Sequence, residues 1–431
     1  MKQRMIVFSA DAMVGEDLEY LSTLPNYRKY LAKSSRAKSV KSIYPSLTFP
    51  AHVSMISGNY PEHHGVYSNS ECMPGDMGLR WHFFYKSVKG GDIFTAAKAK
   101  GLSTASVWWP VTVGHPAVDH LMAVYWKQSP EDTFLDAHRR AGSDEGMIKI
   151  MEKYLNDGWT ERVSPGFDEF KINVACDTIK TYKPDILAVH PINIDSYRHH
   201  YGVFNDMVRR GIEETDRWIG RLFLAMEEAG VQDETNFFLV SDHGQMDTKR
   251  RINFNVLLAE KGLLKVDENG KLADWDAYCH SGGMSALIYL KDPQDPELYR
   301  KTEKVLREIM EGEVFGVGQV FTKREVLEKE HLDGDFSFVI ESDGYSAFSD
   351  GWTRPLVKPL DSSDYRYGKA THGYLPEKGP QPVFLAAGPA IKEGELTEAC
   401  SIIDEAPTYA KILGVDLPDA VGVSMDAILK L

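Results

Sequence analysis

Short and uniformly apolar runs recur along the chain, and most of them end in polar residues. A run that is apolar throughout, rather than alternating with polar residues, is typical of a strand buried on both faces of a mostly parallel sheet. We therefore predict that these runs form the strands of one central sheet. They occupy positions 4–11, 39–48, 184–195, 235–244 and 382–388.

Helical patterns separate these runs. The clearest one spans 206–230, where apolar residues recur at spacings of three and four and Gly230 follows as a residue that ends helices. Strands that alternate with helices indicate an α/β fold, here a mostly parallel central sheet between layers of helices.

The stretch from about 250 to 365 breaks this pattern. It combines a strand-like run, MSALIYLKD, a charged helical run, DPELYRKTEKVLREIMEG, and a turn-rich tail. We predict an α/β core made of residues 1–250 and 365–431, which carries the site. The segment 251–364 is then an inserted α+β subdomain that covers part of that site.

Composition and charge narrow the partners and the compartment. With 43% hydrophobic and 26% charged residues, the chain resembles ordinary globular proteins. Its formal net charge of −14 disfavours nucleic-acid polymers and anionic membranes, which attract basic surfaces. The start, MKQRMIVFSADAM, has too short an apolar run for a signal segment or a membrane span. The four cysteines form no CxxC pair and are expected to be free thiols. These features predict a cytoplasmic location and leave the oligomeric state undetermined.

Polar residues follow several of the predicted strands directly. In an open α/β sheet, ligands gather beyond the carboxyl ends of the strands, so residues far apart in the sequence can converge on one site. The residues in question are Asp11, Thr48, Asp195, Asp242 and His243.

Two segments carry a carboxylate beside an imidazole. In INIDSYRHHYG, Asp195 and His199 are four residues apart, which places them on one face of a helical turn. In VSDHGQ, Asp242 and His243 are adjacent at a strand end, and Gly244 lets the backbone turn tightly. Both pairs suit a divalent metal such as zinc. Each also fits a structural role, as a helix cap with a surface histidine or as a polar turn.

Two further residues complete the set of candidate metal ligands. Asp11 ends the first strand, where it either binds a metal or caps the next segment. His372, in KATHGYLP, either binds a metal or is a loop histidine. Three carboxylates and three imidazoles are enough ligands for two metals about 4 Å apart that clamp an in-line phosphoryl displacement.

The order of these motifs along the chain resembles that of a known group of enzymes. Asp11, SLTFPAHVSMISGNYPEHHGVYSN, IDSYRHHYG, VSDHGQ and THGY occur in the order found in the alkaline phosphatase superfamily. Within it, the chain is most similar to the nucleotide pyrophosphatase/phosphodiesterase family, from residue 5 to about 390. The resemblance implies an alkaline phosphatase-like fold and a metal-dependent phosphoric diester hydrolase.

The resemblance also implies a pair of zinc sites. Manganese and iron are alternatives to zinc for ligands of mixed nitrogen and oxygen type. One zinc ion would be held by Asp195, His199 and His372, and the other by Asp11, Asp242 and His243 together with the oxygen of Thr48.

The same resemblance assigns roles to Thr48 and Asn69. Thr48 matches the family's nucleophile, and Asn69 matches the side chain that donates a hydrogen bond to a phosphoryl oxygen. A metal-bound threonine hydroxyl has a lowered pKa and can attack phosphorus, forming a phosphoryl-enzyme that water then hydrolyses. If FPAHVSMIS is a helix, its N-terminal amides also favour the phosphate. On sequence alone, Thr48 could instead cap that helix and Asn69 could be a turn residue.

The substrate pocket departs from the family pattern. Phe49 follows the nucleophile as in the family's phosphodiesterases, where the ring can stack on a nucleobase, although a buried aromatic residue is the alternative. His190 stands where the family commonly has a tyrosine, and Val203 follows Gly202 where the family has a proline. We predict a small anionic phosphodiester or a nucleotide as substrate, with Phe49 and His190 in its pocket.

Two other functions fit parts of this pattern. Phosphonoacetate hydrolases, which cleave a carbon–phosphorus bond, share the threonine nucleophile and both metal sites. A metal-binding protein without turnover is the other alternative, which a missing Thr48 or His372 would favour, but both residues are present. Sulfatases need a C/S-x-P-x-R run, which SLTFP lacks, and phosphomonoesterases of the alkaline phosphatase type use a serine.

Overall fold

A computed structural model describes residues 2–76, 78, 80–361, 363 and 368–430 of the chain. Its largest sheet has eight strands in the order β19-β2-β18-β6-β1-β5-β3-β4. Neighbouring strands run parallel except where β18 pairs with β6 and β2, so the prediction of a mostly parallel sheet is confirmed. The strands are β1 (Arg4–Ser9), β2 (Ser35–Lys41), β3 (Thr104–Val107), β4 (His120–Met122), β5 (Ile186–Val189), β6 (Thr235–Val240), β18 (Phe384–Ala387) and β19 (Leu396–Ser401).

The central strands of the sheet are buried on both faces. β1 lies between β6 and β5, and all three strands are almost wholly buried. Their sequences, RMIVFS, ILAV and TNFFLV, have large apolar side chains on both faces because helices cover both. The parallel arrangement also brings the carboxyl ends of the three strands to one edge.

Two predicted strands differ from the structure. The run 39–48 is not one strand, because β2 ends at Lys41 and the chain continues as a loop into helix α2 (Thr48–Ser57). In that loop, the Ser42 hydroxyl donates to the Asp242 carbonyl at 2.6 Å and the Ser46 hydroxyl to the Tyr374 carbonyl at 2.8 Å. These bonds tie the loop to other segments instead of to a strand ladder. The run 382–388 contains a strand, β18, but that strand is antiparallel to its neighbours.

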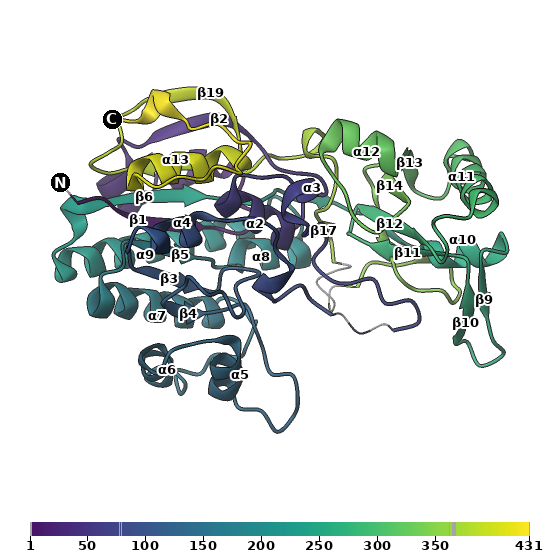
Figure 1. Cartoon of the computed structure of the whole chain (residues 1–431), viewed down its shortest axis with the longest axis horizontal. Coiled ribbons are helices and arrows are strands. Elements are labelled where there is room, and N and C mark those ends of the chain that lie inside the picture. Colours follow the sequence, from purple (N-terminus) through teal and green to yellow (C-terminus); the bar gives the residue numbers. More distant parts are fainter. Residues whose placement is uncertain (1, 77, 79, 362, 364–367, 431) are drawn as a thin grey trace.

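Two groups of helices pack around the sheet (Figure 1). In the first group, α9 packs against α7, α8 and α1, and in the second α13 packs against α4 and α2. The predicted helix at 206–230 is confirmed as α9, and Gly230 ends it with a φ of 68°. The helices of the core are α1 (Asp17–Leu21), α2 (Thr48–Ser57), α3 (Pro61–His64), α4 (Ile93–Ala99), α5 (Phe134–Ala141), α6 (Glu145–Glu152), α7 (Gly166–Tyr182), α8 (Asn193–Tyr201), α9 (Asp206–Ala229) and α13 (Glu405–Leu413).

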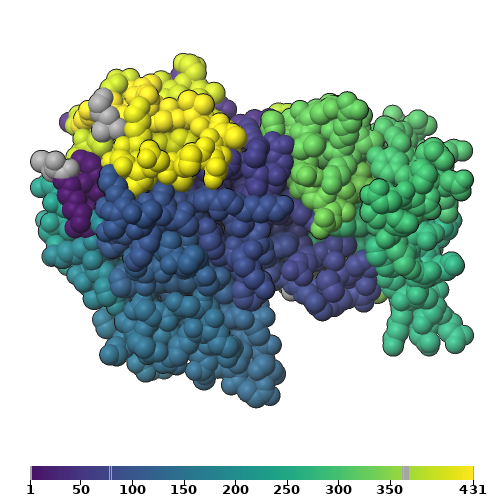
Figure 2. Space-filling view, viewed as in Figure 1, coloured from purple at the N-terminus to yellow at the C-terminus, as the bar shows by residue number. Residues whose placement is uncertain are grey.

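The elements from β8 to β16, here called the insert, form a lobe at one end of the molecule, drawn in green in Figures 1 and 2. The insert has its own sheet, in the order β11-β12-β14-β13, with an apolar cluster against it. Its domain boundaries stay a prediction. The elements are β8 (Arg250–Asn253), α10 (Phe254–Glu260), β9 (Leu264–Val266), β10 (Leu272–Trp275), β11 (Ala277–Ser281), β12 (Ser285–Leu290), α11 (Pro296–Glu311), β13 (Val317–Thr322), α12 (Lys323–Glu330), β14 (Phe338–Ser342), β15 (Ser346–Ser349) and β16 (Val357–Lys358).

Two short strands flank the insert and return the chain to the core. β7 (Met246–Asp247) precedes it and pairs in antiparallel fashion with β17 (Ala370–Thr371), which follows it. This pairing holds His372, the residue after β17, close to the carboxyl edge of the main sheet, where Asp242 and His243 lie just before β7.

Candidate metal and phosphoryl-transfer site

A cavity of about 450 Å³ lies at the carboxyl edge of the sheet, where the core meets the insert. The core lines it with predicted site residues and with a group of aromatic rings, and the insert adds a turn of small residues. The predicted residues on its wall are Asp11, Thr48, Phe49, Asn69, His190, Asp195, His199 and His372.

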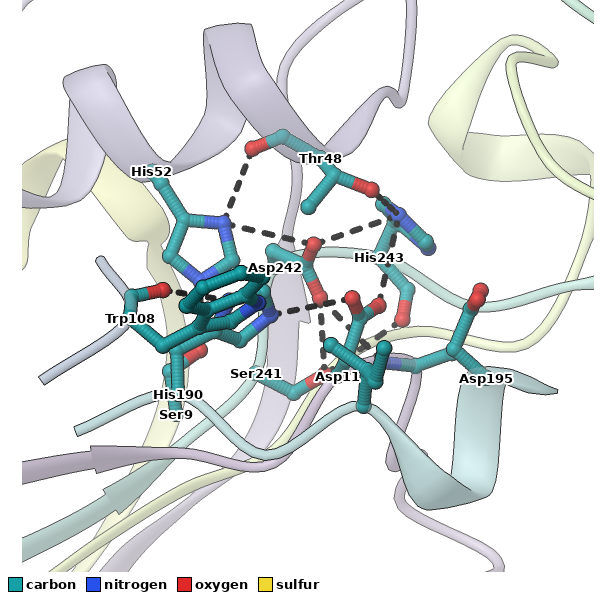
Figure 3. A network of polar contacts seen from close by, with 12 residues as sticks. Ser9, Asp11, Thr48, His52, Trp108, His190, Asp195, Ser241, Asp242 and His243 are labelled. Carbon is teal, nitrogen blue, oxygen red and sulfur yellow. Dashed lines mark hydrogen bonds and ion pairs between the residues drawn. The ribbon is translucent and has the colours of Figure 1, made fainter. Parts of the chain in front are cut away.

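Three other predicted residues lie around Nε2 of His243 (Figure 3). This nitrogen lies 3.2 Å from Asp242 Oδ2, 3.7 Å from Asp11 Oδ1 and 3.0 Å from the hydroxyl oxygen of Thr48. Asp11 and Asp242 stand just beyond β1 and β6, which are paired, and Thr48 opens α2. We call Asp11, Asp242 and His243 the first cluster; their ligand atoms all lie within 4.8 Å of one another.

A second cluster consists of Asp195, His199 and His372. Asp195 Oδ1 lies 3.3 Å from His199 Nε2 and 4.0 Å from His372 Nε2. The Nδ1–H of His199 donates to the Ala370 carbonyl at 2.8 Å, which leaves Nε2 as the ring's ligand atom. The rings of His243 and His372 are 4.1 Å apart between centroids, so the two clusters adjoin.

The electrostatics of the first cluster fit a bound cation. Asp11 Oδ1 and Asp242 Oδ2 are buried and accept no hydrogen bond from the part of the chain that the structure describes. Burial raises the pKa of Asp11, and the nearby carboxylates Asp242 and Asp195 raise it further. A metal cation would supply the missing positive charge, and carboxylate oxygens with imidazole nitrogens are zinc's usual donors.

The second cluster has a different charge balance. Burial raises the pKa of Asp195, but the neighbouring His199, His372 and His243 lower it by more, so the carboxylate stays ionised. Burial, followed by the proximity of His243, lowers the pKa of His372 well below its ordinary value. A neutral imidazole beside an ionised carboxylate is the protonation state that metal binding requires.

Thr48 does not cap the helix, contrary to one reading of the sequence. Helix α2 begins at Thr48 itself, and its N-cap residue is Leu47, which makes no side-chain cap. The Thr48 hydroxyl instead points to His243. Asn69 provides the missing acceptor, because its Oδ1 accepts the backbone N–H of Phe49 at 2.9 Å. This bond fixes the orientation of the Asn69 amide, so its NH₂ group is the part that can donate to a ligand in the cavity.

His190 contacts buried groups behind the cavity wall as well as lining the cavity. It lines the cavity, but its Nε2 is 2.9 Å from Asp11 Oδ2 and its Nδ1–H donates to the Trp108 carbonyl at 3.1 Å. His52 lies beside it, with ring centroids 4.2 Å apart, and also approaches Asp242 at 3.5 Å. His190 therefore supports a candidate ligand, and its contact with substrate stays a prediction.

Three aromatic residues, Phe49, Trp81 and Trp126, form what we call the aromatic wall of the cavity. Of these, only Phe49 was predicted from the sequence. The ring centroids of Phe49 and Trp81 are 5.1 Å apart, and those of Trp81 and Trp126 are 5.5 Å apart. The guanidinium of Arg162 lies 4.1 Å from the centre of the Trp126 ring. The sequence shows no motif for this wall, because the three rings come from separate loops and helices.

The insert reaches the cavity through the turn between β11 and β12. Gly283 adopts a φ of 84°, and a Cβ atom on it would lie 2.5 Å from the carbonyl oxygen of His372. Only glycine fits this close approach. The N–H of Met284 donates to the same carbonyl at 2.9 Å, so the insert helps to place the loop that carries His372.

A mostly parallel sheet with two adjoining carboxylate and imidazole clusters, and a hydroxyl at a helix start, is the arrangement that the resemblance to the alkaline phosphatase superfamily implies. Within this superfamily, the chain belongs to the type I phosphodiesterase/nucleotide pyrophosphatase family, whose family model matches residues 5–375. The resemblance read from the motifs is thereby confirmed.

Named relatives agree with this membership. Ectonucleotide pyrophosphatase/phosphodiesterase family member 3 of Bos taurus is 24% identical over 253 residues, 57% of this chain and 25% of that protein. Family member 1 of Homo sapiens is 25% identical over 277 residues, 61% of this chain and 26% of that protein. A venom phosphodiesterase of Naja atra is 24% identical over 56% of this chain and 26% of that protein. The chain thus spans about a quarter of the curated relatives it matches.

Solved structures share the fold over the whole chain. Murine ectonucleotide pyrophosphatase/phosphodiesterase 5 superposes with a TM-score of 0.68 and 17% identity, over 99% of this chain and 100% of that one. An inactive variant of the murine protein, in complex with AMP, superposes with a TM-score of 0.66 and 16% identity, over 99% and 100% of the two chains. The predicted alkaline phosphatase-like fold is confirmed.

The predicted cytoplasmic location is wrong. The matched relatives are named as ectonucleotide enzymes and venom phosphodiesterases. The prediction rested on unpaired cysteines and on a short apolar run near residue 5. All four cysteines are unpaired in the structure, but secreted proteins need not form disulfides, so free thiols do not define a compartment. The described residues contain no helix with the length and hydrophobicity to cross a membrane.

The second cluster can be tested by metal content. His199→Ala should lower bound zinc by about one ion per chain, because it removes one of three protein ligands. His200→Ala is the matched control, since its ring Nδ1–H donates to the Ser196 carbonyl of the same helix at 2.7 Å. Elemental analysis of both variants, purified without chelator, measures the difference. Equal zinc content in the two variants would exclude His199 as a ligand.

Proposed function

We propose that the chain is a two-zinc phosphodiesterase of the nucleotide pyrophosphatase type, with Thr48 as its nucleophile. The observation that best supports this proposal is the position of the Thr48 hydroxyl, which lies 3.0 Å from His243 Nε2 and beside the first cluster. A hydroxyl at that point could join Asp11, Asp242 and His243 as a further ligand of a bound metal. Manganese or iron could replace zinc at these donors.

Thr48 would begin the reaction. Its Oγ attacks phosphorus and forms a Thr48–O–P ester, while the alcohol or phosphate on the opposite side leaves and takes up a proton. Water then attacks the same phosphorus, breaks the ester and returns the proton to the Thr48 hydroxyl. Bound zinc would lower the pKa of the attacking hydroxyl and neutralise charge on the phosphoryl oxygens.

Two elements of the chain would stabilise the phosphoryl group. The NH₂ group of Asn69, oriented by the bond from the Phe49 N–H to Asn69 Oδ1, can donate to a phosphoryl oxygen. The start of α2 adds the positive end of the helix dipole; its Phe49 N–H already donates to Asn69, and Pro50 has no N–H. Both act on the oxygens where negative charge develops during the attack.

A nucleotide ester is the substrate that the cavity favours. The aromatic wall offers flat rings for a nucleobase, and Arg162 adds a positive charge at the far end of the wall from Thr48. The relative solved in complex with AMP has the same fold. We therefore infer a small anionic phosphodiester, with a nucleotide as the preferred form.

A diester preference tests this function. The wild-type protein with zinc should hydrolyse bis-p-nitrophenyl phosphate and p-nitrophenyl-TMP at least about ten-fold faster than p-nitrophenyl phosphate, because the wall and metals accommodate a second ester group. Phosphonoacetate belongs in the same panel. Hydrolysis of phosphonoacetate alone would favour the carbon–phosphorus hydrolase, and zinc binding without turnover of any substrate would favour a metal-binding protein.

Thr48 variants test the nucleophile. Thr48→Ala should lower kcat by about a thousand-fold or more while keeping zinc, because three protein ligands remain at the first cluster. Thr48→Ser keeps a hydroxyl and should retain measurable turnover. Steady-state rates and zinc content of both variants provide the measurement. Near-normal kcat in Thr48→Ala would show that another group attacks phosphorus.

Phe49 tests base stacking. Phe49→Leu should raise KM for p-nitrophenyl-TMP by about ten-fold, since a base–aromatic stack contributes roughly 1–3 kcal/mol. KM for methyl p-nitrophenyl phosphate, which has the same leaving group and no base, is the internal control. Equal changes in KM for the two esters would mean that the ring only supports the fold.

A further inference from the structure

A buried histidine of the insert joins the insert to the segment that carries Asn69. His280, in β11, has 4% of its surface exposed. Its Nδ1 lies 3.1 Å from Asp350 Oδ2, and its Nε2 lies 3.1 Å from the backbone carbonyl oxygen of Ser70. The Ser70 hydroxyl oxygen also lies 3.4 Å from Nε2. The Asp350 carboxylate and the closer Ser70 carbonyl are both acceptors, so the ring donates to both only when each nitrogen carries a proton, as in imidazolium.

Ser70 links this histidine to the reaction centre. It follows Asn69 directly in the chain, and its carbonyl is the acceptor for His280. The core also holds this segment. The His82 N–H donates to the Asn69 carbonyl at 3.0 Å, and Ser70 forms an isolated antiparallel β-bridge with Trp81. Ser70 and Asn69 both line the cavity.

Asp350 completes the connection within the insert. Its Oδ1 accepts the backbone N–H of Ser281 at 2.5 Å, and it too lines the cavity. Ser281 begins the turn that contacts the His372 loop through Gly283 and Met284. The insert thus contacts both the Asn69 segment and the His372 loop from one short stretch of chain.

We propose that His280 is a positioning residue, whose doubly protonated ring fastens the Asn69 segment to the insert and so aligns the Asn69 amide with a phosphoryl group at Thr48. The role rests on the proposed function, since it presumes that Asn69 donates to the substrate. His280 itself is buried behind the cavity wall and does not contact the substrate.

The charges around His280 determine how this role depends on pH. Asp350 is the carboxylate against the ring. His82 and Tyr289 also lie near the ring, and the thiols of Cys72 and Cys279 lie near Asp350. Burial lowers the pKa of His280, but the charge and hydrogen bond of Asp350, with the hydrogen bond to Ser70, raise it by more, so its pKa lies above the ordinary value. The imidazolium is therefore present below its folded pKa and is lost as pH rises through that value.

The first test compares two histidines that join the insert to the core. His280→Asn should lower kcat for p-nitrophenyl-TMP by about ten-fold with little change in KM, because a misplaced Asn69 loses stabilisation of the transition state. His331→Asn is the control, since its exposed ring pairs with Glu62 at 2.8 Å, away from the cavity lining. Equal kcat values for His280→Asn and the wild type would overturn the proposal.

The second test separates the charge from the contact. Asp350→Asn offers an amide NH₂ to Nδ1 of His280, which favours the neutral ring with Nε2–H still donating to Ser70. The alkaline decline of kcat should weaken in Asp350→Asn, because the neutral ring keeps its bond to Ser70, and the His280 ring resonance should titrate at lower pH by nuclear magnetic resonance. A His280 pKa that is unchanged in Asp350→Asn would overturn the proposal even if the fold is intact.

These readouts also separate the two proposals. If the wild type hydrolyses no diester, the proposed function fails, whatever the titration of His280 shows. If the wild type is active and His280→Asn is equally active, the proposed function stands and the positioning role of His280 fails.

Discussion

The site depends on acidic side chains held where water cannot screen them. Asp11 and Asp242 are almost fully buried, and their mutual proximity raises the pKa of Asp11. Buried like charges are unfavourable unless a cation or a proton compensates them. A bound metal would resolve this conflict, and the neighbouring imidazoles, neutral when buried, would complete the coordination without adding charge. The same cations would then receive the negative charge of the substrate, which a chain of net charge −14 would otherwise repel.

The topology of the sheet brings these acidic side chains close together. β1 lies between β6 and β5, and the three strands are parallel, so Asp11, Asp242 and the helix that carries Asp195 all follow neighbouring strand ends. Apolar side chains on both faces of these strands fix their spacing. Thr48 and His372 then enter from a helix start and from the strand pair that closes the insert. The central sheet thus positions most of the candidate metal ligands, and the segments around it carry the residues that we propose contact the substrate.

The strand ends could be predicted from sequence because each apolar run and its polar terminus are local signals. Asp11, Asp195 and the pair Asp242 and His243 carry that signal directly. The start of α2 at Thr48 and the bond from Phe49 to Asn69 could not be predicted, since they depend on how separate segments pack. The contact between His280 and Ser70 joins residues 210 positions apart, and no periodicity or motif marks it.

The central claim is that two metal ions occupy the two clusters. A crystal structure of the wild-type protein grown with zinc, with anomalous differences recorded at the zinc absorption edge, tests it most directly. We predict two peaks about 4 Å apart, one between Asp11, Asp242, His243 and Thr48, and one between Asp195, His199 and His372. A single peak, or peaks away from these side chains in zinc-saturated crystals, would contradict the account.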